Sequence, residues 1–198
     1  SSFGAGGSNA HLLIEEYIPE ERHPLGVRSG AGSGRSPALI VLSAKDEERL
    51  RERVRQFVAC LTDESAAGLD LADVAYTLQV GREAMPQRLA LMATSLDELA
   101  PKLMSYLRGD HVDDLFLGRV ADRAVGLAQQ RHRDAGGAPA AANESTVDDW
   151  LERGAFAELL ASWVRGLVFD WHRLYDDEGR PPPRRVSLPT YPFAGQRY

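Results

Sequence analysis

The fold is decided by the stretch ALIVLSAKDEERLRERVRQFVACL at residues 38–61. It opens on a short apolar run after Pro37, which is typical of a buried strand. Ser43 and Asp46 follow with the spacing of a capping box. Beyond them the apolar residues recur at helical intervals: Leu50, Val54, Phe57, Val58 and Leu61. The stretch therefore predicts a strand followed by an amphipathic helix that begins near Ser43.

The opposite face of this helix is charged. Glu47 and Arg51 have the spacing of an ion pair on a helix, as do Glu52 and Arg55. Such pairs stabilise an isolated helix by about 0.2–0.5 kcal/mol each. We therefore interpret the charge run as solvated helix surface rather than as a binding patch.

Similar signals predict further elements along the chain. Asp70 is expected to begin a second helix, and Gly81 to end it in the left-handed conformation. Ser95 with Glu98 forms another capping box, but Pro101 should kink or shorten the helix that follows. Apolar runs predict strands at residues 38–42, 88–94 and 114–120.

A last helix is expected to begin at Thr146, with Asp149 completing its cap. Its apolar stripe consists of Phe156, Leu159, Leu160, Trp163, Val164 and Leu167. This spacing predicts one helix with a single apolar face.

Length and composition bound the class of protein. A chain of 198 residues, 43% of them hydrophobic, can bury one core with extended arms. A net charge of −6 argues against a nucleic-acid partner, because phosphate binding needs clustered Lys and Arg in excess. No apolar run is long enough to cross a membrane, so we expect a cytoplasmic protein with no membrane partner. The single cysteine, Cys60, is expected to be a buried or half-buried structural thiol.

The residues themselves provide no catalytic constellation. A nucleophile elbow of the GxSxG type is absent, and the nearest imitation, Gly32-Ser33-Gly34, lies in the proline- and glycine-rich segment 19–37. The 5 histidines show no ligand spacing, so no metal site is expected. The glycine loop at residues 4–9 precedes a strand, whereas phosphate-binding loops follow a strand and open a helix. We therefore expect no cofactor in this chain.

The end of the chain combines aromatic, basic and proline residues. Leu188, Tyr191 and Phe193 alternate with Pro189 and Pro192. Two prolines disfavour an ordinary terminal strand, because each one removes a ladder donor, although this alternative stays open. The pattern predicts an extended arm whose large apolar side chains pack in a groove.

Several stretches together resemble modular type I polyketide synthases. SSFGAGGSNAH at residues 1–11 matches the SSFGxGGxNAH loop at the C-terminal end of a ketosynthase. VFDWHRLY at residues 168–175 and RRVSLPTYPFAGQRY at residues 184–198 resemble the VDWxxLY and RRVxLPTYPFxxxRYW segments of the linker that follows an acyltransferase. The middle of the chain is similar to the linker domain between ketosynthase and acyltransferase. Because no acyltransferase lies between these stretches, the chain resembles the flanking region, or acyltransferase docking domain, of a trans-acyltransferase synthase.

The resemblance implies an α+β fold, in which a small three-stranded antiparallel sheet carries helices packed on one face, plus extended N- and C-terminal arms. Residues 1–18 would be the ketosynthase C-terminal segment, 19–37 a flexible linker, and 38–120 the ketosynthase-to-acyltransferase linker (flanking) domain. Residues 121–144 would be a flexible segment at the position of the lost acyltransferase. Residues 145–198 would form the post-acyltransferase linker helix and a wrapping arm.

The resemblance leaves two classes of function open. In the first, the chain is a non-catalytic structural and docking region that braces the adjacent ketosynthase and recruits a free trans-acting acyltransferase. Its further partner is an acyl carrier protein, which carries phosphopantetheine. In the second, the chain is a fragment that completes the ketosynthase active site for decarboxylative condensation. The ketosynthase cysteine and histidines are absent, so in neither class is the chain alone an enzyme.

The resemblance also implies site residues for each class. For the active-site role, the backbone N–H of Ala5 would contribute to the ketosynthase oxyanion hole, beside Gly4, Gly6, Gly7 and Asn9. For the interaction role, the expected residues are Trp171, Leu174, Tyr175, Arg184, Arg185, Leu188, Tyr191 and Phe193. We expect these side chains to pack across the linker domain and onward against the ketosynthase, with both arginines at the solvated edge.

Overall fold

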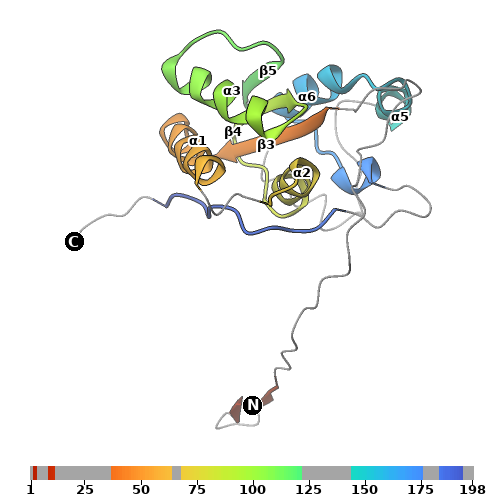
Figure 1. Cartoon of the computed structure of the whole chain (residues 1–198). Helices are drawn as coiled ribbons and strands as arrows, with labels where there is room; N and C mark the ends of the chain where they lie inside the picture. Colours follow the sequence, from red (N-terminus) through yellow and green to blue (C-terminus); the bar gives the residue numbers. More distant parts are fainter. Residues whose placement is uncertain are drawn as a thin grey trace.

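The computed structural model describes residues 2–3, 9–11, 37–63, 68–121, 144–175 and 183–193 (Figure 1). Its centre is a three-stranded antiparallel sheet in the order β3-β4-β5. The strands span Ala38–Ala44, Gln87–Ala93 and Leu115–Arg119. The predicted α+β class and three-stranded sheet are confirmed. The flexibility expected for residues 19–37 and 121–144 falls almost wholly outside the described residues.

Helices surround this sheet and lie close to the predicted positions. They are α1 (Glu47–Thr62), α2 (Leu71–Val80), α3 (Leu96–Arg108), α5 (Glu144–Arg153), α6 (Phe156–Val164) and the 3₁₀ helix η2 (Trp171–Leu174). Helix α1 begins later than predicted, because the carboxylate of Asp46 accepts the Arg49 N–H at 2.8 Å and so caps it. Ser43 instead stays in β3, where its hydroxyl accepts the Met85 N–H at 2.9 Å.

The caps of α2 and α3 follow the sequence closely, with two differences. Asp70 and Ser95 are the N-caps, as predicted. Gly81 ends α2 with φ −95°, so the predicted left-handed end is wrong; a Cβ there would lie 2.6 Å from the Thr77 oxygen, and close packing is what requires glycine. Helix α3 runs through Pro101 without ending, so the predicted shortening is wrong as well.

The last predicted helix is two helices. Thr146 lies inside α5 rather than at its cap, and α5 ends at Gly154, whose φ of 66° is left-handed. Helix α6 then carries the predicted apolar stripe, in which Leu159 and Leu160 are fully buried. The break lets α6 lie against the sheet while α5 packs on α6.

Both faces of the sheet are covered. On one face, Arg88 reaches the backbone oxygen of Trp163 at the end of α6, and Gly118 beside it would place a Cβ only 2.2 Å from the Val164 oxygen. Because side chains alternate along a strand, Leu89 and Leu91 point to the other face, where α1 and α3 contact β4. Every residue of β3 is buried. Helices α1 and α3 therefore form the predicted layer on one face, and α6 adds a second layer on the opposite face.

The free edge of β3 is closed by side chains instead of a further strand. The Gln79 amide donates to the Leu39 oxygen at 2.7 Å, and the Arg53 guanidinium donates to the Ser43 oxygen at 2.6 Å. These bonds satisfy strand carbonyls that have no ladder partner on that side. Helix α2 therefore lies along the edge of the sheet, below β3 in the view of Figure 1.

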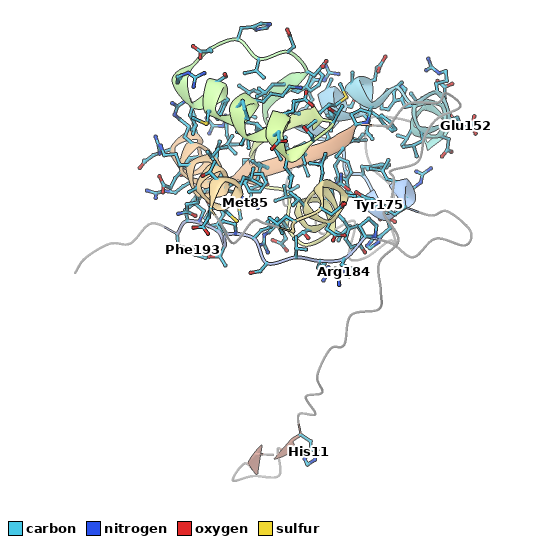
Figure 2. All side chains as sticks on the ribbon, in the orientation of Figure 1. His11, Met85, Glu152, Tyr175, Arg184 and Phe193 are labelled. Atoms are coloured by element: carbon cyan, nitrogen blue, oxygen red, sulfur yellow. The ribbon has the colours of Figure 1, made fainter. Side chains whose placement is uncertain are left out.

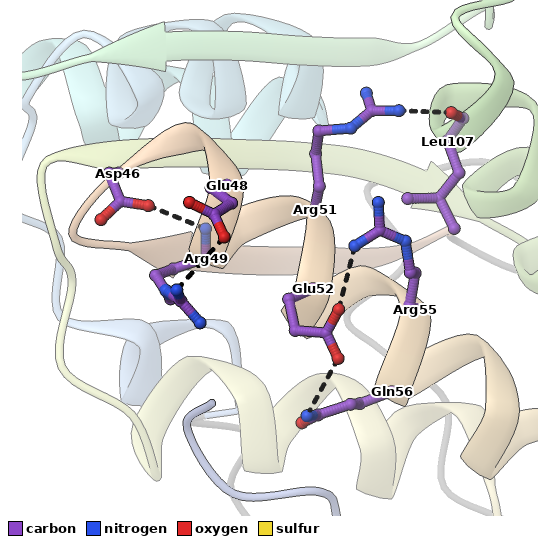
Figure 3. A network of polar contacts seen from close by, with 8 residues as sticks. All are labelled: Asp46, Glu48, Arg49, Arg51, Glu52, Arg55, Gln56 and Leu107. Atoms are coloured by element: carbon purple, nitrogen blue, oxygen red, sulfur yellow. Dashed lines mark hydrogen bonds and ion pairs between the residues drawn. The ribbon is translucent and has the colours of Figure 1, made fainter. Parts of the chain in front are cut away.

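The charged face of α1 is solvated, as expected, but its pairing differs in part (Figure 3). Arg55 pairs with Glu52 at 2.9 Å, as predicted. Arg51 does not pair with Glu47; its guanidinium donates to the Leu107 oxygen at the end of α3 at 2.5 Å. This contact ties α1 to α3 on the face of the sheet opposite α6.

The N-terminal residues form a short hairpin of their own. Strands β1 (Ser2–Phe3) and β2 (Asn9–Ala10) pair antiparallel, with Phe3 opposite Asn9. The intervening loop, with Gly4, Ala5, Gly6 and Gly7, lies outside the described residues. The predicted oxyanion-hole role of Ala5 therefore stays a prediction.

Candidate interaction surface

The predicted interaction residues fall into two groups in the structure. Trp171 and Leu174 lie on η2 and are buried in the chain's own core. The Trp171 ring makes edge contacts with Phe169 at 5.0 Å and with Trp163 at 6.1 Å between ring centroids. These side chains hold the C-terminal part of the chain to α6, so they are not exposed for a partner.

Tyr175 connects η2 to the edge of the sheet. Its hydroxyl donates to the Gln79 side-chain oxygen at 2.7 Å, and the amide nitrogen of Gln79 donates onward to Leu39 in β3. Its ring packs edge-on against Tyr76 at 5.0 Å. Burial raises the pKa of Tyr175 well above its usual value, which keeps the hydroxyl protonated as a donor.

The second group lies in residues 183–193, which we call the terminal arm. Figure 2 shows Arg184 and Phe193 towards opposite ends of the arm, which passes beneath α2 and α1. The backbone N–H of Arg184 donates to the Asp73 carboxylate at 2.8 Å. The N–H of Val186 donates to the Thr77 hydroxyl at 2.9 Å. Both acceptors belong to α2 and are themselves buried.

Further along, the terminal arm is held by the Arg82 side chain and by the backbone N–H of Lys45. The Arg82 guanidinium lies 3.4 Å from the Leu188 oxygen and 3.5 Å from the Pro189 oxygen. The Lys45 N–H donates to the Tyr191 hydroxyl at 3.2 Å. Leu188 itself is buried and belongs to the hydrophobic core. The terminal arm is therefore fixed at several points along its inner side.

The other side of the terminal arm faces outward. Its exposed residues, which we call the outer row, are Arg185, Ser187, Thr190 and Phe193. Phe193 is 81% exposed and touches Tyr191 at 5.0 Å between ring centroids. Phe193 is therefore not buried against the linker domain, and its expected contact with the ketosynthase stays a prediction. Arg184 is half-buried and Arg185 exposed, so only the latter lies at the solvated edge.

One buried arginine, Arg53, lies close to Arg82 and to Tyr191 of the terminal arm. Arg53 is 5% exposed, and burial, helped by the like charge of Arg82, lowers its pKa to about 10. The neighbouring Tyr191 hydroxyl partly offsets this. Arg53 remains charged at neutral pH, since its pKa stays far above it.

Sequence reasoning missed the residues that hold the terminal arm: Asp73, Thr77, Gln79 and Arg82. A usable signal was present, because Asp73 and Thr77 are polar residues one helical turn apart. On a helix whose opposite side is apolar, such a pair reads as solvated surface. The terminal arm, which is distant in sequence, lies against this pair, so that Asp73 and Thr77 become buried acceptors for its N–H groups.

Other candidate chemistry is absent from the described ranges. Within them, no group of three or more His, Cys, Asp or Glu is placed to hold a metal ion. Cys60 is half-buried, as predicted, and burial raises the pKa of its thiol. None of the helices described combines the length and apolar character that crossing a bilayer needs.

Comparison with known proteins accounts for this arrangement. Residues 41–110 match the family described as RhiE-like, KS-MAT linker domain. Polyketide synthase PksM of Bacillus subtilis is 44% identical over 200 residues, which cover 100% of this chain and 4% of PksM. Polyketide synthase ThaG of Burkholderia thailandensis is 41% identical over 206 residues, again covering 100% of this chain and 3% of ThaG. The chain is a linker region of a polyketide synthase. It spans only a few per cent of the length of these relatives.

Solved structures give the neighbour of this linker region. The ketosynthase from module 6 of the Bacillus subtilis bacillaene synthase is 34% identical, with a TM-score of 0.64 over 81% of this chain and 27% of that one. The ketosynthase from module 1 of the Bacillus amyloliquefaciens bacillaene synthase is 33% identical, with a TM-score of 0.63 over 84% and 27%. The linker region therefore lies next to a ketosynthase. It is not itself a catalytic domain. The division of the chain into five parts stays a prediction.

Proposed function

We propose that this linker region braces the adjacent ketosynthase and takes no part in catalysis of its own. The observation that carries the proposal is the two-sided terminal arm. Its inner side is fixed to α2, while the outer row presents Phe193 and Arg185 to solvent. Aromatic and arginine side chains are enriched at protein interfaces, where they supply most of the binding energy. The outer row therefore fits a surface of the neighbouring ketosynthase.

We also propose that the synthase is of the trans-acyltransferase type. Strand β5 and helix α5 both contact α6, so the segment between them starts and ends on one compact unit. The alignment with PksM covers 200 residues against 198 here, which leaves no room for an acyltransferase inside the aligned stretch of PksM. A separate acyltransferase then loads the acyl carrier protein, and phosphopantetheine belongs to the carrier. The linker region is proposed to help recruit that acyltransferase.

A second candidate function rests on the N-terminal hairpin. Strands β1 and β2 pair through Phe3 and Asn9, and residues 4–8 stand between them in the sequence. If these residues complete the ketosynthase active site through the Ala5 N–H, the chain contributes to condensation and needs no docking role. The two candidates differ in their partner, since only the first requires affinity for a discrete acyltransferase.

The bracing role is tested by side-chain footprinting with hydroxyl radicals. The linker region is labelled alone and joined to its ketosynthase. We expect Phe193 to be oxidised readily in the isolated chain and several-fold more slowly in the joined protein. Met104 of α3, which is 43% exposed, serves as the internal reference because it lies on a different element. Equal oxidation of Phe193 in both proteins would overturn the bracing role.

The docking role is tested separately with the discrete acyltransferase of the same pathway. Titration calorimetry with the joined protein should give saturable binding. The titration is repeated with two variants to locate the contact. Arg185→Glu changes the outer row, and Arg153→Glu on α5 is the control. Absence of binding to the wild-type protein would leave the linker region with the ketosynthase as its partner and remove recruitment from the proposal.

A further inference from the structure

We infer that α2 and Arg82 form a peptide-binding site that recognises the main chain of an extended segment, with residues 183–193 as its ligand. Three side chains make the site: Asp73 and Thr77 accept two backbone N–H groups, and Arg82 faces two backbone carbonyls. No contact in this set depends on the identity of the arm's own side chains. The site therefore binds the segment by its backbone, and covalent connection to the rest of the chain is not required for recognition.

The spacing of the acceptors matches an extended ligand. Asp73 and Thr77 are four residues apart on α2, a rise of about 6 Å along the helix axis. Arg184 and Val186 are two residues apart on the terminal arm, about 6.6 Å in an extended chain. One turn of helix thus presents an acceptor to every second N–H of the ligand. This geometry fixes the register of the segment, because a shift by one residue would turn both N–H groups away.

The acceptors are prepared before the ligand arrives. Asp73 lies in the first turn of α2, where the helix dipole stabilises its negative charge. The Thr77 hydroxyl donates to the Asp73 backbone oxygen at 2.7 Å, so its lone pairs face the Val186 N–H. Because these acceptors are already oriented, the surface of α2 needs little rearrangement when the segment binds, and this favours affinity.

The ligand has a matching chemistry. Pro183 and Pro192 are buried and carry no N–H that would need a partner. Leu188 is buried in the core between them, and the Tyr191 hydroxyl accepts the Lys45 backbone N–H. A proline-containing segment loses little conformational entropy on binding, because its extended form is already populated. The site is thus specific for an extended segment with a leucine anchor, while the outer row is free to vary.

The first test uses amide hydrogen exchange on the full chain. We expect the amides of Arg184 and Val186 to be protected and that of Ser187 to exchange fast. Thr77→Val removes one acceptor and should speed exchange at Val186 about fivefold to tenfold, the loss expected for one buried neutral hydrogen bond. Thr62→Val, at the far end of α1, is the matched control because its hydroxyl bonds only within its own helix. Unchanged protection of Val186 in Thr77→Val would overturn backbone recognition.

The second test asks whether the segment binds without a covalent link. A protease site placed between Tyr175 and Pro183 is cut in the folded full chain, and a labelled peptide of residues 183–193 competes for the vacated site. We expect saturable binding. N-methylation of Val186 should weaken it about tenfold or more, and N-methylation of Ser187 should change it less than about threefold.

Each outcome of the second test bears on the inference. Loss of the cut segment with no peptide binding would overturn it, as would equal effects of the two N-methyl groups. Neither test involves the ketosynthase, so failure here leaves the proposed bracing role intact. Conversely, an unprotected Phe193 in the joined protein leaves this peptide-binding site intact.

Discussion

Gly118 shows how one missing side chain decides the packing of a whole helix. A Cβ at this position would lie 2.2 Å from the Val164 oxygen, and backbone cannot move aside as a flexible side chain can. We therefore expect Gly118→Ala to destabilise the chain by about 1–3 kcal/mol, the usual cost of overpacking. Urea denaturation measures this. Leu117→Ala is the control, since its side chain is 52% exposed and its loss should cost less than about 0.5 kcal/mol.

Glu98 makes the stability of the fold depend on pH. Its carboxylate bonds Lys102 and accepts both the N–H and the hydroxyl of Thr94, which lowers its pKa from 4.5 to about 2. A carboxyl group whose folded pKa is depressed stabilises the fold above its unfolded pKa, and this stabilisation is lost as pH falls.

The wild-type chain should therefore exceed Glu98→Gln in stability by about 1–2 kcal/mol at pH 7, allowing for the partial exposure of the carboxylate. The difference should shrink as pH falls from 4.5 towards about 2. Urea denaturation at several pH values measures it. A difference that stays constant over this range would contradict the assignment of the cap to the charged carboxylate.

At the residue scale, the sequence predicted features that depend on neighbouring residues, such as helix caps. It did not predict contacts between residues that lie far apart in the chain. Asp70 and Ser95 were predicted as caps because capping depends on neighbours a few residues away. Ser43 was misread for the same reason: its actual partners, Glu83 and Met85, lie some forty residues further along the chain. Gly118 carries no local signal at all, since its constraint comes from α6.

Among the elements, α3 carries a proline that its structure does not need. Pro101 lies in an unbroken helix and is exposed, so its ring removes a hydrogen bond without filling a core position. Proline in a helix interior costs about 3 kcal/mol relative to alanine, and part of this is offset by its effect on the unfolded chain. Pro101→Ala should therefore raise stability by about 1–2 kcal/mol. Thermal unfolding measures the gain; Met104→Ala, on the same exposed face, should produce none.

The two sides of the terminal arm should respond differently to mutation, because Leu188 anchors the inner side and Phe193 lies on the outer side. Leu188→Ala should cost about 2–4 kcal/mol in the isolated chain, because it leaves a cavity in the core. Phe193→Ala should change stability by less than about 0.5 kcal/mol there, since the ring is 81% exposed. Urea denaturation of both variants tests the pair. A large loss in Phe193→Ala would show that the ring is buried in solution.

Alternating aromatic and proline residues predicted an extended arm with inward-packed apolar side chains; the arm is extended, and Leu188 and Tyr191 pack inward, whereas Phe193 does not. The alternation did not predict which side of the arm faces inward. That choice is made by Asp73 and Thr77 on α2, which are separated from the arm by more than a hundred residues. The helix on which they lie was predicted correctly, but no role was predicted for its polar residues.

The described residues from Ala38 onward share one hydrophobic core. Arg88 of β4 is 2% exposed; its guanidinium donates to Trp163 and Leu167, and it lies 4.9 Å from the Trp163 ring. Strand β4 belongs to the first half of the chain and α6 to the second, so neither half can complete its core without the other. Local patterns could not predict this, because each half reads as a separate amphipathic layer.

The positions of the three tryptophans allow a direct test of this unity. Trp150, Trp163 and Trp171 all follow residue 144, so fluorescence reports the second half of the chain. Amide exchange of β3, in which every residue is buried, reports the first half. We expect both probes to give the same free energy of unfolding in urea. Arg88→Met should lower both by about 2–4 kcal/mol, because the carbonyls of Trp163 and Leu167 lose their donor inside the core. Glu152→Gln, at an exposed position of α5, should shift neither. A fluorescence transition at lower urea than the opening of β3 would show two independent units and contradict the single core.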